Sequence, residues 1–447
     1  MARKAVKKSA FKAGMYLLET LTAGMYNNPL AIYREYIQNS ADSIDVALKV
    51  NPWNSKRINI HLEPSEGSIT VSDKGAGISS AHAEDILSSV GLSWKKDLNL
   101  RGFRGIGRLG GLAFCNRATF RTKAKDEDVE SIQEWGCEKL RQLMSGSEKK
   151  AYSLKQLFNR STTFYQENGK KKTGSYFEVK LSGVKSFRNH LMDIKKVYDF
   201  LSVTAPVPFH PQEMSFAKKI SEYLASKIYD YSTYDIILNG EPVYKPYRDM
   251  VKLTSKGHDI IERIEPFEIK INGVAVAYGW YGQRKHLLGA IAKGQMSSGI
   301  RVRVGNIQIG DNHLLDSCFR EIRFNSYVVG EIHVNCADLM PNSRRDDFVD
   351  NETKRLFYNE IERGLGLPIS KQIRLSSRLR SRKKTLSDQS ISPVIQSTIN
   401  LDRRNKPPKA MEQIVTNNSP VNGVDLLAVI KKECKDCAVL KKLIRNE

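Results

Sequence analysis

The chain has 447 residues, 40% of them hydrophobic, and its 71 lysines and arginines against 49 aspartates and glutamates give a net charge of +22. This length predicts roughly two to four domains. No apolar run reaches the roughly 20 residues of a membrane helix, so we expect no membrane partner. The basic residues 1–14 lead into no apolar core, which argues against a secretory signal.

The charge and the cysteines indicate partners and compartment. The six cysteines are scattered, which favours a reducing compartment over a disulfide framework, so we expect a cytoplasmic protein. Residues 371–447 hold 17 lysines and arginines against 7 acidic residues, an excess of ten positive charges. Such an excess favours a polyanionic partner, nucleic acid in particular, although a basic tail that only improves solubility has the same composition.

Residues 1–205 mix helical and strand patterns. The stretch 27–50 predicts one long helix, which Asn28 can cap and whose first turn suits Pro29. The segments 57–63 and 68–73 alternate apolar and polar residues around a glycine-bearing turn, which predicts a hairpin. A short helix is expected within 80–91 and a further strand at 173–181, and 204–209 resembles a domain boundary.

Three further segments follow this boundary. Residues 206–370 predict an α+β domain with several strands, at 233–240, 267–273, 274–282, 300–310 and 330–336, and with a helix near 351–365. Residues 371–423 are basic and rich in polar residues, which indicates a flexible linker. Residues 424–447 predict one C-terminal amphipathic helix.

The first motif lies in the long helix, REYIQNSADSID at 34–45. Glu35 and Asn39 are one helical turn apart and therefore share a face. A carboxylate there can accept a proton from water, and an amide oxygen can ligate a hard cation such as Mg²⁺. A polar, solvent-facing side of a helix would show the same spacing.

The second motif is SDKGAGIS at 72–79, in which Asp73 ends a strand and Gly75 and Gly77 follow. Glycines let the backbone turn tightly and approach a ligand closely. An aspartate at a strand end can accept a hydrogen bond from an exocyclic amine such as that of adenine. An ordinary turn after an edge strand is the alternative.

The third motif is RGFRGIGRLGG at 101–111, where glycines alternate with Arg104 and Arg108. Backbone N–H groups of such a loop, together with a following helix N-terminus, can bind phosphates. A flexible loop is the alternative, and no strand–loop–helix unit surrounds the motif as a Rossmann fingerprint requires.

The order and spacing of the three motifs resemble the boxes of the GHKL superfamily of ATPases, which includes DNA gyrase, the ninety-kilodalton heat-shock chaperone, histidine kinases and MutL. The resemblance covers about residues 10–200. The helix is most similar to the heat-shock-chaperone branch, with the MORC branch a near relative. The resemblance to this superfamily implies an α+β chain with an N-terminal Bergerat-fold two-layer α/β sandwich, then a βαβ-rich transducer-like domain and a basic tail.

The resemblance also implies ATP and Mg²⁺ as cofactors and a role for each motif residue. Glu35 would activate the water that attacks the γ-phosphate, Asn39 would hold Mg²⁺, Asp42 would support the pocket and Asp73 would recognise adenine. Gly75 and Gly77 would let the base and ribose approach. The third box would wrap the phosphates, through Gly102, Arg104, Gly105, Ile106 and Gly107.

Three outlying positions complete the implied site. Lys95 or Lys96 could reach a phosphate, and Ser175 occupies the place where the family usually has a threonine. The stretch LMPNSRRDDF at 339–348 resembles the loop that carries a basic residue to the γ-phosphate. By motif position this residue is Arg345, with Arg344 as the alternative. The two arginines could instead pair with the two aspartates that follow.

The implied function is an ATP-hydrolysing switch that closes as an ATP-dependent homodimeric clamp. The charge suggests that the clamp acts on nucleic acid, double-stranded DNA first, in DNA repair, DNA compaction or phage defence, with a companion protein as a further possible partner. An ATP-locked binding module with negligible hydrolysis and a protein-remodelling chaperone are the alternatives. The presence of Glu35 favours the enzyme.

Overall fold

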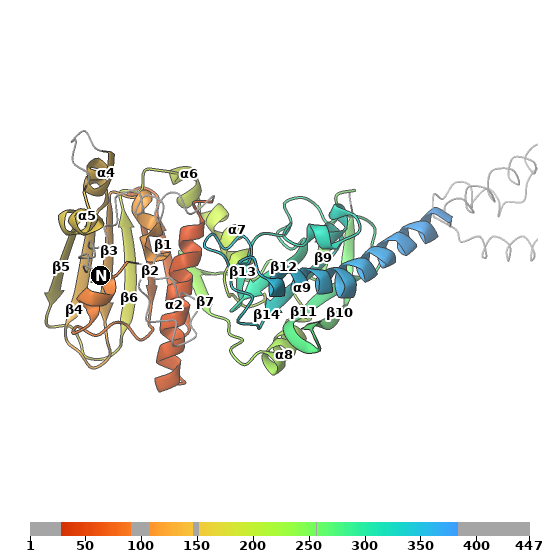
Figure 1. Cartoon of the computed structure of the whole chain (residues 1–447), viewed down its shortest axis with the longest axis horizontal. Helices are drawn as coiled ribbons and strands as arrows, with labels where there is room; N and C mark the ends of the chain where they lie inside the picture. Colours follow the sequence, from red (N-terminus) through yellow and green to blue (C-terminus); the bar gives the residue numbers. More distant parts are fainter. Residues whose placement is uncertain (1–27, 91–106, 146–151, 256, 383–447) are drawn as a thin grey trace, which may run out of the picture. The chain divides into compact units, whose positions relative to one another are not determined.

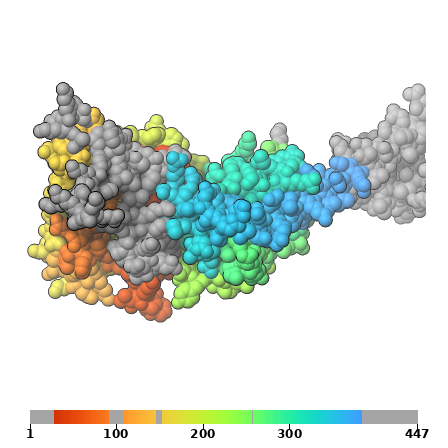
Figure 2. Space-filling model, viewed as in Figure 1, coloured from red at the N-terminus to blue at the C-terminus, as the bar shows by residue number. Residues whose placement is uncertain are grey.

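A computed structural model describes residues 28–90, 107–145, 152–255 and 257–382, and the remaining residues are grey in Figures 1 and 2. The chain divides into two compact units, residues 1–370 and 371–447. The described part of the second unit, up to residue 382, is helical. Among the described residues, every helix is too short or too polar to cross a membrane.

The first unit begins with an eight-stranded sheet in the order β5-β4-β3-β6-β2-β1-β7-β8. Neighbouring strands are antiparallel except for β1 and β7, which run parallel. The strands are β1 (Arg57–Glu63), β2 (Ser68–Asp73), β3 (Arg117–Lys123), β4 (Glu130–Gly136), β5 (Thr162–Glu167), β6 (Tyr176–Ser182), β7 (Asp235–Leu238) and β8 (Glu241–Pro242). The hairpin expected at 57–73 is therefore confirmed.

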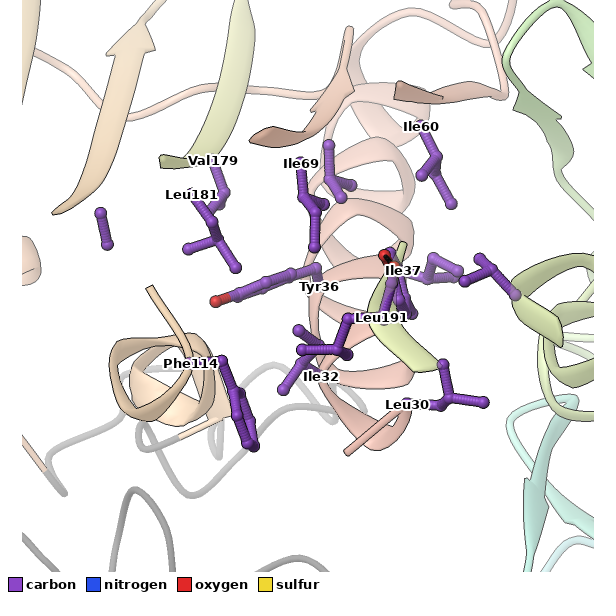
Figure 3. Packing of buried hydrophobic residues seen from close by; sticks show 14 of the residues in the cluster. Leu30, Ile32, Tyr36, Ile37, Ile60, Ile69, Phe114, Val179, Leu181 and Leu191 are labelled. Atoms are coloured by element: carbon purple, nitrogen blue, oxygen red, sulfur yellow. Dashed lines mark hydrogen bonds between the residues drawn. The ribbon is translucent and has the colours of Figure 1, made fainter. Parts of the chain in front are cut away.

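Helices contribute to a single core with this sheet. Along β1 every second residue is buried, so one face of the strand points into the core and the other points outward. The helices are α2 (Ala31–Val50), α3 (Ala83–Ser88), α4 (Cys137–Ser145), α5 (Leu154–Ser161), α6 (Arg188–Leu191) and α7 (Ile194–Thr204), with a 3-10 helix η2 (Gly107–Ala113). Figure 3 shows Tyr36 and Ile37 of α2 beside Ile69 and Leu181 of the strands, and these side chains belong to the core. The expected α+β two-layer arrangement is confirmed.

The start of α2 agrees with the expected capping by Asn28. The regular helix begins at Ala31, and Leu30 before it makes no side-chain cap. The Asn28 carboxamide oxygen accepts a hydrogen bond from the Leu30 N–H at 3.0 Å, and its carbonyl accepts one from the Ala31 N–H at 3.0 Å. Asn28 therefore caps the turn through Pro29 that leads into the helix.

The second sheet has six strands in the order β13-β12-β14-β11-β10-β9. They are β9 (Met250–Lys252), β10 (His258–Ile271), β11 (Val274–Arg284), β12 (Gly299–Val304), β13 (Ile307–Ile309) and β14 (Val329–Val334). The parallel pair β12–β14 is connected through β13 and the 3-10 helices η3 (Asp316–Cys318) and η4 (Ile322–Tyr327). Helices α8 (Ala217–Lys227) and α9 (Glu352–Ile361) pack on β10, and the π-helix η5 (Glu362–Gly366) follows α9.

The strand expected at 233–240 lies in the first sheet, although the sequence places it after the boundary at 204–209. Its residues form β7, which pairs with β1 in parallel from Arg57 opposite Asp235 to Ile60 opposite Leu238. The chain thus passes through 204–209 and α8 before it returns to the first sheet (Figure 1). This return positions the second sheet's residues close to the end of α7.

A fully buried charged cluster lies in the second sheet. Glu331 of β14 accepts two hydrogen bonds of 2.8 Å from the Lys245 ammonium and one of 2.5 Å from the Arg303 guanidinium of β12. His333 contacts the same carboxylate at 3.1 Å. Burial alone would raise the pKa of Glu331, but the charges of Arg303 and Lys245 hold it well below its usual range. Buried charges are tolerated when they are paired in this way.

The buried histidine predicts an acid-sensitive fold. Burial lowers the pKa of His333 to about 4, because the imidazolium would lose its hydration. The unfolded chain protonates this group near pH 6.5, so its contribution to stability is complete above that pH and is lost as the pH falls towards 4. One proton over this window corresponds to roughly 3 kcal/mol. His333→Gln should therefore show a flatter fall in the free energy of unfolding between pH 6.5 and 4.5.

Urea denaturation of both proteins at several pH values measures this difference. Glutamine keeps an N–H donor for Glu331 and does not titrate, so it isolates the histidine from the carboxylate, which titrates at lower pH. Parallel stability curves for the two proteins would refute the assignment.

Candidate functional site

The face of α2 with the first motif presents three oxygen-bearing side chains. Glu35 is 9% exposed and Asp42 is 1% exposed, while Asn39 is half-buried. Helical spacing places Asn39 one turn after Glu35, and Asp42 lies about one turn after Asn39 on the same face. A polar solvent face would leave these groups exposed, so the burial of both carboxylates excludes that alternative. Asp45, further along the helix, instead accepts a hydrogen bond from the Tyr234 hydroxyl.

Three chain segments meet at the Glu35 carboxylate. Its Oε1 lies 3.4 Å from Nη2 of Arg34 and 3.5 Å from Nε of Arg345. Its Oε2 would lie 2.5 Å from a Cβ placed on Gly107, at the start of η2. A residue with a Cβ at this position would displace the carboxylate, so the glycine lets the third motif approach it this closely. The structure brings the first motif, the third motif and the 342–347 loop together at one buried acid.

The loop that contains Arg344 and Arg345 lies between β14 and α9. Arg345 has a left-handed backbone, with φ of +57°, which is a strained conformation for a residue with a Cβ. The Arg344 carbonyl accepts a hydrogen bond of 3.2 Å from Arg34, whereas its side chain is exposed. The guanidinium directed at Glu35 is therefore that of Arg345.

The two aspartates after these arginines have other partners. Asp346 accepts a hydrogen bond of 2.6 Å from the Asn342 side chain. Asp347 accepts one of 2.7 Å from the Tyr358 hydroxyl and lies 2.8 Å from the Lys354 ammonium. These contacts hold the pKa of Asp347 below its ordinary value, against the effect of burial. The contacts that the structure shows therefore do not include the arginine–aspartate pairing considered from the sequence.

The second motif forms a tight turn at the end of β2. Asp73 is 2% exposed, and its Oδ1 accepts a hydrogen bond of 2.9 Å from the Gly75 N–H. A Cβ on Gly75 would lie 2.2 Å from the Ser43 hydroxyl of α2. Gly77 has φ of +65°. Gly75 is thus required for packing of the turn against α2 and Gly77 for its left-handed backbone beside β3, and close approach to a ligand remains a prediction for both.

Residues of β3 and of the segment just before β6 support this turn, and two of them, Thr122 and Lys123, belong to none of the sequence motifs. The Ser175 hydroxyl donates to the Gly75 carbonyl at 2.6 Å. The buried Thr122 hydroxyl accepts from the Ile78 N–H at 2.8 Å, and the Lys123 ammonium donates to the Gly174 carbonyl at 2.6 Å. Polar residues at the buried end of a strand were the only signal in the sequence for Thr122 and Lys123.

The third motif is described only from Gly107 onward. Lys95, Lys96, Gly102, Arg104, Gly105 and Ile106 lie outside the described residues. Arg108 is buried and donates a hydrogen bond of 3.1 Å to the Leu87 carbonyl and a second one to the Ser89 carbonyl. Burial lowers the pKa of Arg108 to about 10. This side chain therefore ties η2 to the end of α3.

The donor set on α2 fits a cation that also takes ligands from elsewhere. Within the described residues, no group of three histidine, cysteine, aspartate or glutamate side chains could hold a metal by itself. An amide oxygen at Asn39 between two buried carboxylates is suited to Mg²⁺, which commonly takes one or two protein oxygens and completes its shell with phosphates and water. The described geometry is thus compatible with a metal held jointly by protein and nucleotide.

The comparison with protein families agrees with this geometry. Residues 31–164 match the family model described as histidine kinase-, DNA gyrase B-, and HSP90-like ATPase. The matched range begins at the first residue of α2 and includes Glu35, the Asp73 turn and the whole third motif. The second sheet and the Arg345 loop lie beyond it. Residues 31–164 of this protein therefore match an ATPase domain of the GHKL type.

Proposed function

We propose that the protein is an ATP-hydrolysing switch in which Arg345 from beyond the ATPase domain completes the site. The observation that carries this proposal is the 3.5 Å contact between the Arg345 guanidinium and Glu35, a buried acid on the helix with the first motif. A general base and a cation for the developing phosphate charge are the two groups that phosphoryl transfer to water requires.

ATP would bind with its base at the second motif. The Asp73 carboxylate would accept the hydrogen bond of the adenine amine, and the Gly75–Gly77 turn, held by Ser175, would form the wall beside it. The third motif, with Gly107 at its end and Lys95 nearby in sequence, would contribute backbone N–H groups and positive charge to the phosphates. Asn39 would hold Mg²⁺, supported by Asp42, and the metal would neutralise phosphate charge.

Hydrolysis would then require two of the protein's own groups. The Glu35 carboxylate would accept a proton from the attacking water, and the Arg345 guanidinium would stabilise the charge that develops on the transferred phosphoryl group. Arg34, which contacts both Glu35 and the Arg344 carbonyl, would keep the acid and the loop in place.

The switch would act as a clamp on nucleic acid. Resemblance to the heat-shock-chaperone and MORC branches supports closure by ATP-dependent dimerisation, and the net charge of +22 supports a polyanionic substrate such as double-stranded DNA. A companion protein could supply the stimulus for hydrolysis instead. Binding through phosphates would weaken steeply with added salt.

Replacement of the proposed base tests the reaction. Glu35→Gln preserves the size of the side chain but cannot accept the proton, so the rate of ATP hydrolysis should fall by about 10²-fold or more while ATP still binds. Phosphate release is measured for both proteins, each with and without double-stranded DNA. We expect DNA to stimulate the unmodified protein and not the variant.

Glu222→Gln, on the exposed side of α8, is the matched control and should leave hydrolysis unchanged. Full activity of Glu35→Gln would refute the proposed base. Activity that requires Glu35 but ignores DNA would indicate a protein partner. ATP-dependent dimerisation of the unmodified protein without hydrolysis would favour the ATP-locked binding module.

Replacement of Asp73 tests base recognition. Asp73→Asn retains an oxygen that can accept from the Gly75 N–H, but it presents an amide donor towards the adenine amine. ATP affinity should fall about 10- to 100-fold, as expected for the loss of a hydrogen bond to a charged group, with a smaller change for GTP. Isothermal titration with both nucleotides measures this. Equal losses for ATP and GTP would exclude Asp73 as the base-reading residue.

Replacement of Arg345 separates its charge from its backbone strain. Arg345→Gly removes the guanidinium but relieves the left-handed conformation, and Glu35 keeps Arg34 as a partner, so the stability of the fold should change little while hydrolysis falls by roughly 10³-fold. Arg344→Ala should remain within about threefold of the unmodified rate, because Arg344 contributes only its carbonyl. Single-turnover rates of ATP hydrolysis and thermal unfolding measure the two effects for each variant. A severe loss of hydrolysis in Arg344→Ala but not in Arg345→Gly would assign the phosphate-stabilising role to Arg344.

A further inference from the structure

Arg303 of β12 connects the second sheet to α7, a helix that packs in the core of the first sheet. Its Nη2 donates to the Val203 carbonyl at 2.7 Å, and its Nη1 donates to the Ala205 carbonyl at 3.4 Å. These carbonyls belong to the end of α7, where the backbone acceptors lack partners within the helix. An arginine from a different sheet therefore caps the C-terminus of α7.

The Arg303 side chain is held rigidly at its other edges. It is fully buried, its Nε contacts Glu331 at 2.5 Å, and its Nη1 donates to the Asn306 carbonyl at 3.0 Å in the turn after β12. Glu331 is in turn held by Lys245. Each of the three guanidinium nitrogens of Arg303 donates a hydrogen bond in the protein interior. The guanidinium therefore cannot change orientation without leaving a buried charge or acceptor unpaired.

The hairpin that contains Arg303 also anchors the Arg345 loop. β12 turns at Asn306 into β13, and the Gly310 N–H directly after β13 donates to the Arg345 carbonyl at 2.8 Å. The Gln308 side chain donates to the Gly310 carbonyl at 2.9 Å. A Cβ on Gly310 would lie 2.9 Å from the Asp346 carbonyl, so the hairpin end and the loop are in close contact.

The α7 side of this connection leads back to the proposed base. Helix α7 packs on α2, the helix that carries Glu35. The Tyr33 hydroxyl of α2 donates to the Leu191 carbonyl of α6 at 2.5 Å, just ahead of α7. Burial raises the pKa of Tyr33, so it remains a donor at any ordinary pH. Arg303 thus bridges the packing of α2 and α7 on one side and the Arg345 loop on the other.

We propose that Arg303 is a positioning residue, which sets the separation of Arg345 from Glu35 by joining the end of α7 to the β12–β13 hairpin. It contacts neither of these two residues and acts through the backbone at Gly310. The proposal rests on the proposed function for its kinetic consequence, but its structural consequence can be tested without nucleotide. Lysine cannot replace Arg303, because one ammonium cannot span Val203, Asn306 and Glu331 with a planar fork.

Kinetics form the first arm of the test. Arg303→Lys should lower kcat for ATP hydrolysis about 10- to 100-fold, as small displacements of catalytic groups do, and leave KM within about threefold. Because Arg303 would act through Arg345, adding Arg303→Lys to Arg345→Ala should cause no further loss of kcat. If Arg303→Lys lowered kcat equally in the unmodified protein and in Arg345→Ala, the proposal would be overturned.

Hydrogen exchange without nucleotide forms the second arm, and Arg284→Lys is the matched control. Arg284 is another fully buried arginine of this sheet, paired with Asp259 at 3.0 Å and bonded to the Gly289 and Tyr327 carbonyls. Arg303→Lys should speed amide exchange in residues 340–349, and Arg284→Lys should not, even where it lowers the melting temperature equally. Unchanged exchange in Arg303→Lys, or the same increase in both variants, would overturn the proposal.

The two arms separate the two hypotheses. If the unmodified protein does not hydrolyse ATP, the proposed function fails, while the exchange experiment still decides whether Arg303 holds the Arg345 loop. If hydrolysis is normal and depends on Glu35, but exchange at 340–349 is insensitive to Arg303→Lys, only the positioning role is refuted.

Discussion

The contact between the Glu35 carboxylate and the Arg345 guanidinium is the interaction on which the candidate site depends. It joins side chains that are 310 positions apart in sequence, and each is restrained from its own side: Glu35 by Arg34 on α2, and Arg345 by the Gly310 N–H after β13. A charged pair in a buried place must be held accurately, since either partner alone would bear the cost of lost hydration. Arg345 makes this contact from a left-handed backbone conformation, which is strained for a residue with a Cβ.

Other parts of the fold position the segments that carry Glu35 and Arg345. The return of the chain to β7 places residues of the second sheet against the end of α7, and the buried carboxylate of Glu331 there orients Arg303 and Lys245. Gly75 and Gly107 allow the second and third motifs to approach α2 more closely than a residue with a Cβ could without displacing its neighbours. The proposed site is thus a place where close backbone packing and paired buried charges occur together.

Several features follow from local pattern and are visible in the sequence. The period-two alternation of β1 and β2, with a glycine-bearing turn, predicts the hairpin that the structure contains. The apolar stripe of α2 predicts a helix with a buried side, and the family motifs mark Glu35 and Asp73. Asn28 and Pro29 likewise predict the start of α2, because a side-chain acceptor followed by a proline favours the turn that leads into a helix.

The sequence by itself therefore determined the elements with a clear local pattern, such as α2 and the β1–β2 hairpin, the order of the motifs and the candidate acid, because helical and strand periodicity and motif spacing are local properties. Only the tertiary structure decided that Arg345 and not Arg344 faces Glu35, that the strand at 235–238 joins the first sheet, and that Arg303 caps α7. These outcomes depend on contacts between residues that are tens to hundreds of positions apart. Such contacts are selected by the burial and pairing of polar groups throughout the fold, which no local pattern records.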